Sequence, residues 1–77
     1  MSRYHKKFYN AIERALDNAD IDYDDEWYYG DDYYGVNVYL DDWDDVDEAW
    51  DILSDVCDDF GARLDDSGTE FYMQLDC

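Results

Sequence analysis

Negative charge constrains this chain more than any other feature of its sequence. The 77 residues include 23 Asp and Glu against 5 Lys and Arg, which gives a formal net charge of −18 at pH 7. An acidic chain with few large apolar residues stays disordered, because it cannot bury enough surface to offset its conformational entropy. Here 47% of the residues are hydrophobic, 19% are aromatic and Pro is absent. We therefore predict one small folded domain over residues 1–77, whose charge serves a basic partner.

The few bases are concentrated at the start of the chain. Four of the five lie within the first 14 residues, and they are Arg3, Lys6, Lys7 and Arg14. Apolar residues recur at helical spacing over residues 2–18, which predicts an amphipathic helix with Ser2 as its N-cap. From residue 15 onward there are 22 acids and one base, Arg63. The bases of the first helix are expected to offset part of this acidity.

Two alternating segments predict a β-hairpin. Residues 21–29 and 33–40 place apolar side chains at every second position, with turn residues at 30–32 between them. Asp25 falls on the apolar side of the first strand, so we expect a bulge or a later strand start near it. Tyrosines on the polar side are expected to form cross-strand pairs, with stacking on a partner's arginine as the alternative. They are Tyr28, Tyr33 and Tyr39, together with Tyr72 of a later strand.

Residues 42–60 show a long helical pattern. Asp41 or Asp42 can cap its start, and Gly61 follows its end, where a glycine commonly terminates a helix. The apolar stripe consists of Trp43, Val46, Ala49, Trp50, Leu53, Val56, Cys57 and Phe60. At about 100° per residue, acidic residues project from the opposite side. This acidic face consists of Asp44, Asp47, Glu48, Asp51, Asp55, Asp58 and Asp59.

The rest of the chain returns to the sheet. Residues 62–64 are followed by a predicted turn at 65–68 and by a last strand with Phe71, Met73 and Leu75 facing inward. The resulting order, α-β-β-α-β-β, predicts an α+β domain. We expect an antiparallel sheet with both helices packed on one of its faces.

The sequence offers little for catalysis or for a cofactor. Its one histidine, His5, has no cysteine or second histidine at zinc-ligand spacing, and there is no glycine-rich phosphate loop. We therefore expect no enzymatic activity, no cofactor and no specific small-molecule ligand. Residues 20–25 have the alternating acids of an EF-hand loop. Because Asp25 replaces its turn glycine and Asp31 its final glutamate, we expect no specific metal site there.

Location and partner follow from the same composition. No segment approaches the roughly 20 apolar residues of a membrane span, and the first residues lead into a patterned helix rather than a signal-peptide core. Cys57 and Cys77 are expected to be reduced thiols of a cytoplasmic protein, with a disulfide as the alternative. Negative charge repels anionic lipid and nucleic acid alike. The expected partner is instead a basic surface on another protein.

The acidic face of residues 42–60 matches the charge spacing of DNA. Its seven carboxylates span a rise of about 21 Å, or about one charge per 3 Å, close to the spacing along one DNA strand. Of the 23 acids 19 are Asp, whose short side chain holds its charge close to the backbone. Acidic pairs in the hairpin, Asp24 with Asp25 and Asp31 with Asp32, extend the negative surface. We predict that the helix face and these pairs act as phosphate mimics against lysine and arginine.

In size, aspartate content, aromatic richness and α+β order, the whole chain resembles small phage-encoded DNA-mimic inhibitors. These include anti-CRISPR and anti-restriction proteins and uracil-DNA glycosylase inhibitors. The resemblance implies a non-catalytic protein in the host-cell cytoplasm that occupies the DNA-binding channel of a defence or repair enzyme. Within this class we favour, by analogy, an anti-CRISPR protein that blocks loading of target DNA onto an effector complex.

Three other functions share this composition. An inhibitor of a restriction or repair enzyme would use the same surface. A halophilic protein would use its acids for solubility in concentrated salt, but its charge would be spread evenly and its aromatic content would be modest. A chaperone of a basic, histone-like protein would bind without depriving its partner of DNA.

Overall fold

The chain folds into two helices and a four-stranded sheet. A computed structural model describes residues 3–76. In chain order the elements are α1 (Arg3–Asn18), β1 (Tyr23–Tyr29), β2 (Tyr33–Leu40), the 3-10 helix η1 (Trp43–Asp45), α2 (Val46–Phe60), β3 (Arg63–Ser67) and β4 (Glu70–Asp76). This confirms the predicted α+β class and the α-β-β-α-β-β order. The predicted cap Ser2 and the thiol of Cys77 lie outside the described residues.

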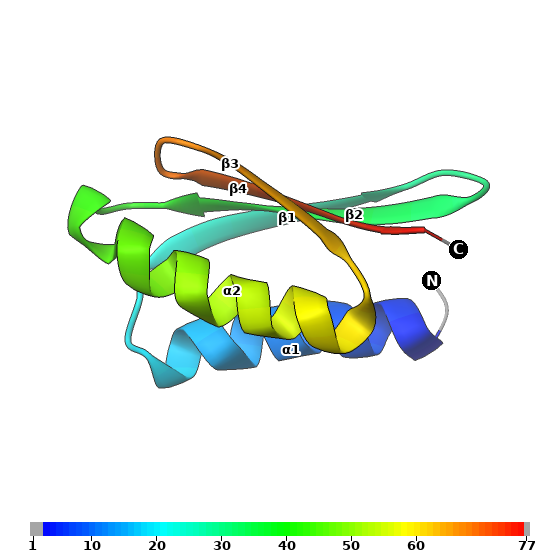
Figure 1. The fold of residues 1–77 in the computed structure, drawn as a ribbon, viewed down its shortest axis with the longest axis horizontal. Helices are drawn as coiled ribbons and strands as arrows, with labels where there is room; N and C mark the ends of the chain where they lie inside the picture. Colours follow the sequence, from blue (N-terminus) through cyan, green and yellow to red (C-terminus); the bar gives the residue numbers. More distant parts are fainter. Residues whose placement is uncertain (1–2, 77) are drawn as a thin grey trace.

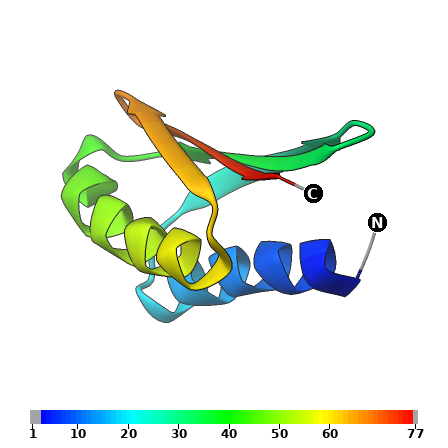
Figure 2. The same cartoon turned by 45° about the vertical axis from the view of Figure 1, so that its right-hand side comes forward.

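The sheet has one covered face and one uncovered face. Its strand order is β1-β2-β4-β3, and all three pairings are antiparallel. Both helices lie side by side on the same face, as predicted (Figures 1 and 2). Along β2, Val36 and Val38 are buried toward the helices, whereas Asn37 and Tyr39 alternate with them and remain partly exposed. Because α2 packs on the face that carries Val36 and Val38, its outer surface points away from the sheet.

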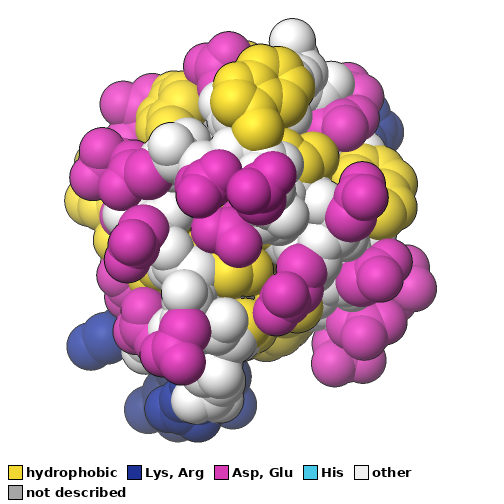
Figure 3. Space-filling view, turned by 90° about the vertical axis from the view of Figure 1, so that its left-hand side faces the viewer, with side chains coloured by type: hydrophobic (Ala, Val, Ile, Leu, Met, Phe, Trp, Pro, Cys, Tyr) yellow, Lys and Arg dark blue, Asp and Glu magenta, His cyan; other side chains and the backbone are white. Residues whose placement is uncertain are grey.

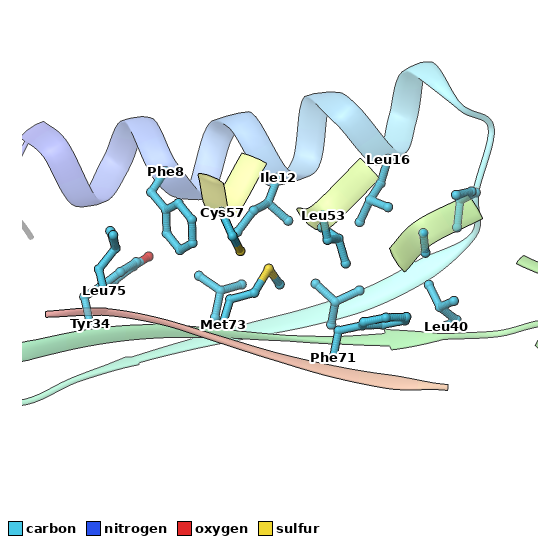
Figure 4. Close-up of a cluster of buried hydrophobic side chains, with 14 residues drawn as sticks. Phe8, Ile12, Leu16, Tyr34, Leu40, Leu53, Cys57, Phe71, Met73 and Leu75 are labelled. Atoms are coloured by element: carbon cyan, nitrogen blue, oxygen red, sulfur yellow. The ribbon is translucent and has the colours of Figure 1, made fainter. Parts of the chain in front are cut away.

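The core fills the space between the helices and the sheet (Figure 4). Buried apolar side chains from both helices meet those of the two central strands. They include Phe8, Ile12, Leu16, Leu53, Cys57, Val36, Val38, Phe71 and Met73. Burial, and then the charge of Asp58, raises the pKa of the Cys57 thiol to about 12. This thiol is therefore an unreactive part of the core at neutral pH.

Of the two alternatives expected near Asp25, the first strand shows the later start. It begins at Tyr23 rather than at residue 21, but no bulge interrupts it. The ladder with β2 is continuous, and Asp25 pairs with Val38. Tyr9 of α1 donates a hydrogen bond to the Asp25 carboxylate, 3.1 Å between the oxygens. Because this hydrogen bond is available, an acid can face the helices without breaking the strand.

The second half of the chain differs from the prediction at one turn and at the start of one helix. Asp65 and Asp66 belong to β3, and the turn is confined to residues 68–69, where Gly68 adopts a left-handed φ of 62°. Asp42 caps η1 through its side chain, and α2 begins four residues later than the predicted residue 42. Gly61 ends α2 with a φ of 68°, as predicted.

Candidate functional site

Helix α2 and the preceding η1 present the predicted acidic face to solvent. All seven of its carboxylates are exposed, namely Asp44, Asp47, Glu48, Asp51, Asp55, Asp58 and Asp59. The same helix buries Ala49, Leu53 and Cys57 against the sheet, so its periodicity directs the acids outward. Between Trp43 and Phe60 there is no basic residue. The acidic face therefore has no counter-charge on its own segment.

Hydrogen bonds from backbone N–H groups fix both ends of this segment. Asp42 accepts a hydrogen bond from the Asp44 N–H at 3.0 Å, and at the other end the Ala62 N–H donates to the Cys57 carbonyl at 2.8 Å. Acids in the first turn of a helix stabilise it, but carboxylates in the last turn oppose its dipole. Asp58 and Asp59 lie in that last turn. Their position is therefore not explained by the stability of the helix.

The structure does not bring the exposed hairpin acids onto this face. Asp24 is exposed on the uncovered side of the sheet, where it pairs with Tyr39. Asp31 and Asp32 lie exposed at the tip of the β1–β2 hairpin, at the opposite end of the molecule from the start of α2 (Figure 1). Strand parity and hairpin length thus place these acids on surfaces other than the acidic face, so they extend the negative surface of the protein without lengthening that face.

Asp25 is not an exposed phosphate mimic. It is half-buried between β1 and α1, and its Oδ2 atom is buried without a hydrogen-bond partner. Burial, followed by the charge of Asp25, raises the pKa of Tyr9 to about 12 and also raises that of Glu13. Asp25 therefore belongs to a cluster between a helix and a strand, and its half-burial there does not favour its predicted role as a phosphate mimic.

An open hollow of about 390 Å³ lies beside this cluster. Its lining is largely acidic and consists of Glu13, Asp17, Ile21, Asp22, Tyr23, Asp24 and Asp25. The Tyr23 hydroxyl donates to an Asp17 carboxylate oxygen at 3.4 Å, close to the limit of a hydrogen bond. Within residues 3–76, no three His, Cys, Asp or Glu side chains are grouped so that they could hold a metal ion.

Two tryptophans that periodicity predicts for the core lie at the surface beside the acidic face. Trp43 is 71% exposed and Trp50 is 40% exposed. The 3-10 turn of η1 changes the direction of Trp43 relative to the apolar side of α2, because it has three residues per turn instead of 3.6. Figure 3 shows exposed hydrophobic side chains among Asp and Glu at this end of the molecule. Sequence reasoning missed this feature, since an indole on an apolar stripe is indistinguishable from a core residue.

The uncovered face of the sheet is organised by tyrosines. Tyr28 and Tyr33 form a cross-strand ring pair with centroids 6.1 Å apart, as predicted. Gly35 leaves room for the Tyr28 ring, since a Cβ there would collide with it. The Tyr39 hydroxyl donates to Glu26 at 2.6 Å, which lowers the pKa of Glu26 and raises that of Tyr39. These tyrosines have structural partners within the sheet.

Comparison with known proteins does not assign the chain to a group. The sequence matches no protein-family model and no curated protein. Among residues 3–76, neither helix combines the length and the apolar character that crossing a membrane requires.

Proposed function

We propose that this protein is a non-catalytic inhibitor that imitates DNA and occupies the DNA-binding surface of a host protein complex. The acidic face of α2 and η1 carries the proposal. It offers seven exposed carboxylates with no base among them, at about one charge per 3 Å of helix. A DNA-binding protein presents lysine and arginine to phosphates at a similar spacing. The acidic face would therefore compete with a duplex for the same side chains.

Within this class, an anti-CRISPR protein remains the member we favour. Such a protein, encoded by a phage, would act in the cytoplasm of the host cell and block loading of target DNA. The nucleic-acid channel of a CRISPR effector is positively charged and recognises the backbone rather than the sequence, which suits an imitation made only of charge. An inhibitor of a restriction or repair enzyme would use the same face in the same manner.

The electrostatics of the acidic face determine how binding should behave. Association should be fast, steered by charge and strongly weakened by salt. Each single Asp→Ala substitution on the face should cost about 0.5–1 kcal/mol or less, because an exposed ion pair contributes little. Loss of several charges together should be needed to abolish inhibition.

The first test is capture from a bacterial lysate at low salt, followed by competition with duplex DNA. We expect the immobilised protein to retain a DNA-binding complex that duplex then displaces, while circular dichroism shows a folded protein at the same low salt. Folding that requires molar salt, with no specific capture, would instead identify a halophilic protein. A basic protein that stays bound while it also holds DNA would identify a chaperone.

Two variants with equal net charge locate the binding surface. The helix-face variant carries Asp→Asn at residues 44, 47, 51 and 55, and the hairpin variant carries Asp→Asn at residues 22, 24, 31 and 32. The helix-face variant should lose on the order of 2–4 kcal/mol of binding, about 30- to 700-fold in Kd. The hairpin variant should lose much less. An equal effect of both variants would show that only net charge matters and would contradict the assignment to α2.

A further inference from the structure

Two of the three exposed tryptophans, Trp43 and Trp50, lie against the β3–β4 hairpin. The Trp43 ring lies against Gly68 in the turn, where a Cβ would come within 3.1 Å of the ring. The Trp50 ring packs against Phe71 of β4, with centroids 6.4 Å apart and a tilt of 36°. Both indoles thus contact the same end of the hairpin while keeping 71% and 40% of their surface exposed. The two rings form an exposed apolar patch at this end of the hairpin.

Carboxylates border this patch from two elements. In α2, Asp47 precedes Trp50 by three residues, so the two side chains are neighbours on the helix surface. On β3, Asp66 is exposed and pairs with Phe71, the residue that supports Trp50. An apolar centre with a charged border is the usual anatomy of a protein interface, and tryptophan is enriched among residues that dominate binding energy.

We propose that Trp43 and Trp50 are the apolar anchors of the partner-binding surface, and that they contact an apolar patch bordered by lysine or arginine on the partner. This inference rests on the proposed function and adds the chemistry of the partner. Charge complementarity selects this occupant, because the border of the patch is acidic. A second copy of the chain is a poor fit, since each copy carries a net charge of −18 and would bring acidic borders together.

The anchors change how binding responds to salt. Screening weakens the attraction between the carboxylates and a basic surface, but it does not weaken the burial of apolar area. A partner that buries both indoles should therefore keep part of its affinity in molar salt. A partner that recognises only the acidic face should lose nearly all of it.

The test uses two synthetic peptides of equal length with equal numbers of lysines. At the central positions that are not lysine, one peptide has leucine and the other has serine. Calorimetry and tryptophan fluorescence measure Kd at low and at molar salt. The wild type should bind the leucine peptide about tenfold tighter than the serine peptide, and only the leucine peptide should bind in molar salt. The variant W43A/W50A should lose this preference, whereas Trp27→Ala, which removes a similarly exposed indole from β1, should keep it.

Two outcomes would overturn the inference: equal binding of both peptides by the wild type, or a leucine preference that W43A/W50A retains. Because Trp50 contacts the core residue Phe71, Trp43→Ala alone provides the test if the double variant does not fold. Self-association that Trp43→Ala abolishes, measured by sedimentation, would also overturn it by making a second copy the occupant.

The helix-face variant separates this inference from the proposed function. It should bind both peptides more weakly at low salt and still prefer the leucine peptide. If its low-salt affinity equals that of the wild type, the acidic face is not the binding surface and the proposed function fails. The inference about the indoles is judged separately, by the leucine preference.

Discussion

Helices α1 and α2 lie side by side on one face of the sheet, and each buries three residues there. They are Phe8, Ile12 and Leu16 on α1 and Ala49, Leu53 and Cys57 on α2. The exposed surfaces of the two helices are opposite in charge. Helix α1 contains four bases and two acids, whereas α2 contains six acids and no base. Since either sign of charge is compatible with this position on the sheet, the acidity of α2 is not a requirement of packing.

The helix dipole strengthens this comparison. Lys6 and Lys7 lie near the start of α1, and Asp58 and Asp59 lie in the last turn of α2. Each pair is at the end of its helix where its charge is unfavourable. Neither pair therefore serves the stability of its own helix. We expect the bases of α1 to offset the acidity of the domain, and we propose that the acids of α2 serve a partner.

The largest expected effect tests the feature that the two helices share, which is the burial of apolar side chains against the sheet. Ile12→Ala on α1 and Leu53→Ala on α2 each remove a fully buried side chain. Each should lower the free energy of unfolding by about 2–5 kcal/mol. Urea unfolding followed by circular dichroism measures both. A loss below about 1 kcal/mol for one of them would show that the two helices do not support the sheet equally.

Much of the fold was predictable because local periodicity carries it. The alternation around Val36 and Val38 and the glycine at residue 61 identified β2 and the end of α2 from neighbours in the sequence alone. The environment of Asp25 could not be obtained in this way. Its hydrogen-bond donor, Tyr9, is 16 residues away, and only the packing of α1 against β1 brings the two together.

The candidate site was predictable only where one helix generates it. The outward position of the six acids of α2 followed from the angle between successive residues, and all six are exposed, as is Asp44 of η1. The positions of Asp31 and Asp32 depend on how far the hairpin extends from the helices, which no local pattern encodes. Trp43 was misplaced because the prediction assumed one continuous helix from residue 42, whereas η1 interrupts its phase.

The next effect tests whether the acids of α2 oppose folding. The helix-face variant should be more stable than the wild type by about 1 kcal/mol at low salt, because it relieves repulsion among exposed carboxylates. The gain should shrink as salt is added. Thermal unfolding at low and high salt measures it. A loss of stability would show that the acidic face contributes to the fold, and the contrast with α1 would then have a structural cause.

A smaller effect of opposite sign is expected on α1. Replacing Lys6, Lys7 and Arg14 by Gln removes exposed bases from a strongly acidic protein. Stability should fall by about 0.5 kcal/mol at low salt, because the substitutions remove the attraction between these bases and the acidic domain. The loss stays small because removing Lys6 and Lys7 also removes their unfavourable interaction with the helix dipole. The same unfolding measurement applies. Unchanged or higher stability would mean that the bases are retained for contact with a partner rather than for charge balance.

The smallest effect concerns Glu13, an acid of α1 that lies beside Asp25 and not on the outer surface. Burial first, and then the charge of Asp25, raises the pKa of Glu13 above its ordinary value of 4.5. The native state therefore holds the Glu13 proton more tightly than the unfolded chain does, so the contribution of this residue to stability decreases as pH rises through the folded pKa. Glu13→Gln should stabilise the protein at neutral pH by less than about 0.5 kcal/mol, because the group is partly solvated.

This gain should disappear as the pH falls toward 4.5, where the Glu13 carboxyl of the wild type takes up its proton. Asp51→Asn on α2 is the matched control, and its effect should respond to salt because its carboxylate is exposed. Unfolding by urea at several pH values and two salt concentrations distinguishes the two. If the gain from Glu13→Gln followed salt and not pH, Glu13 would behave as one more surface acid, and the internal cluster around Asp25 would have no separate role.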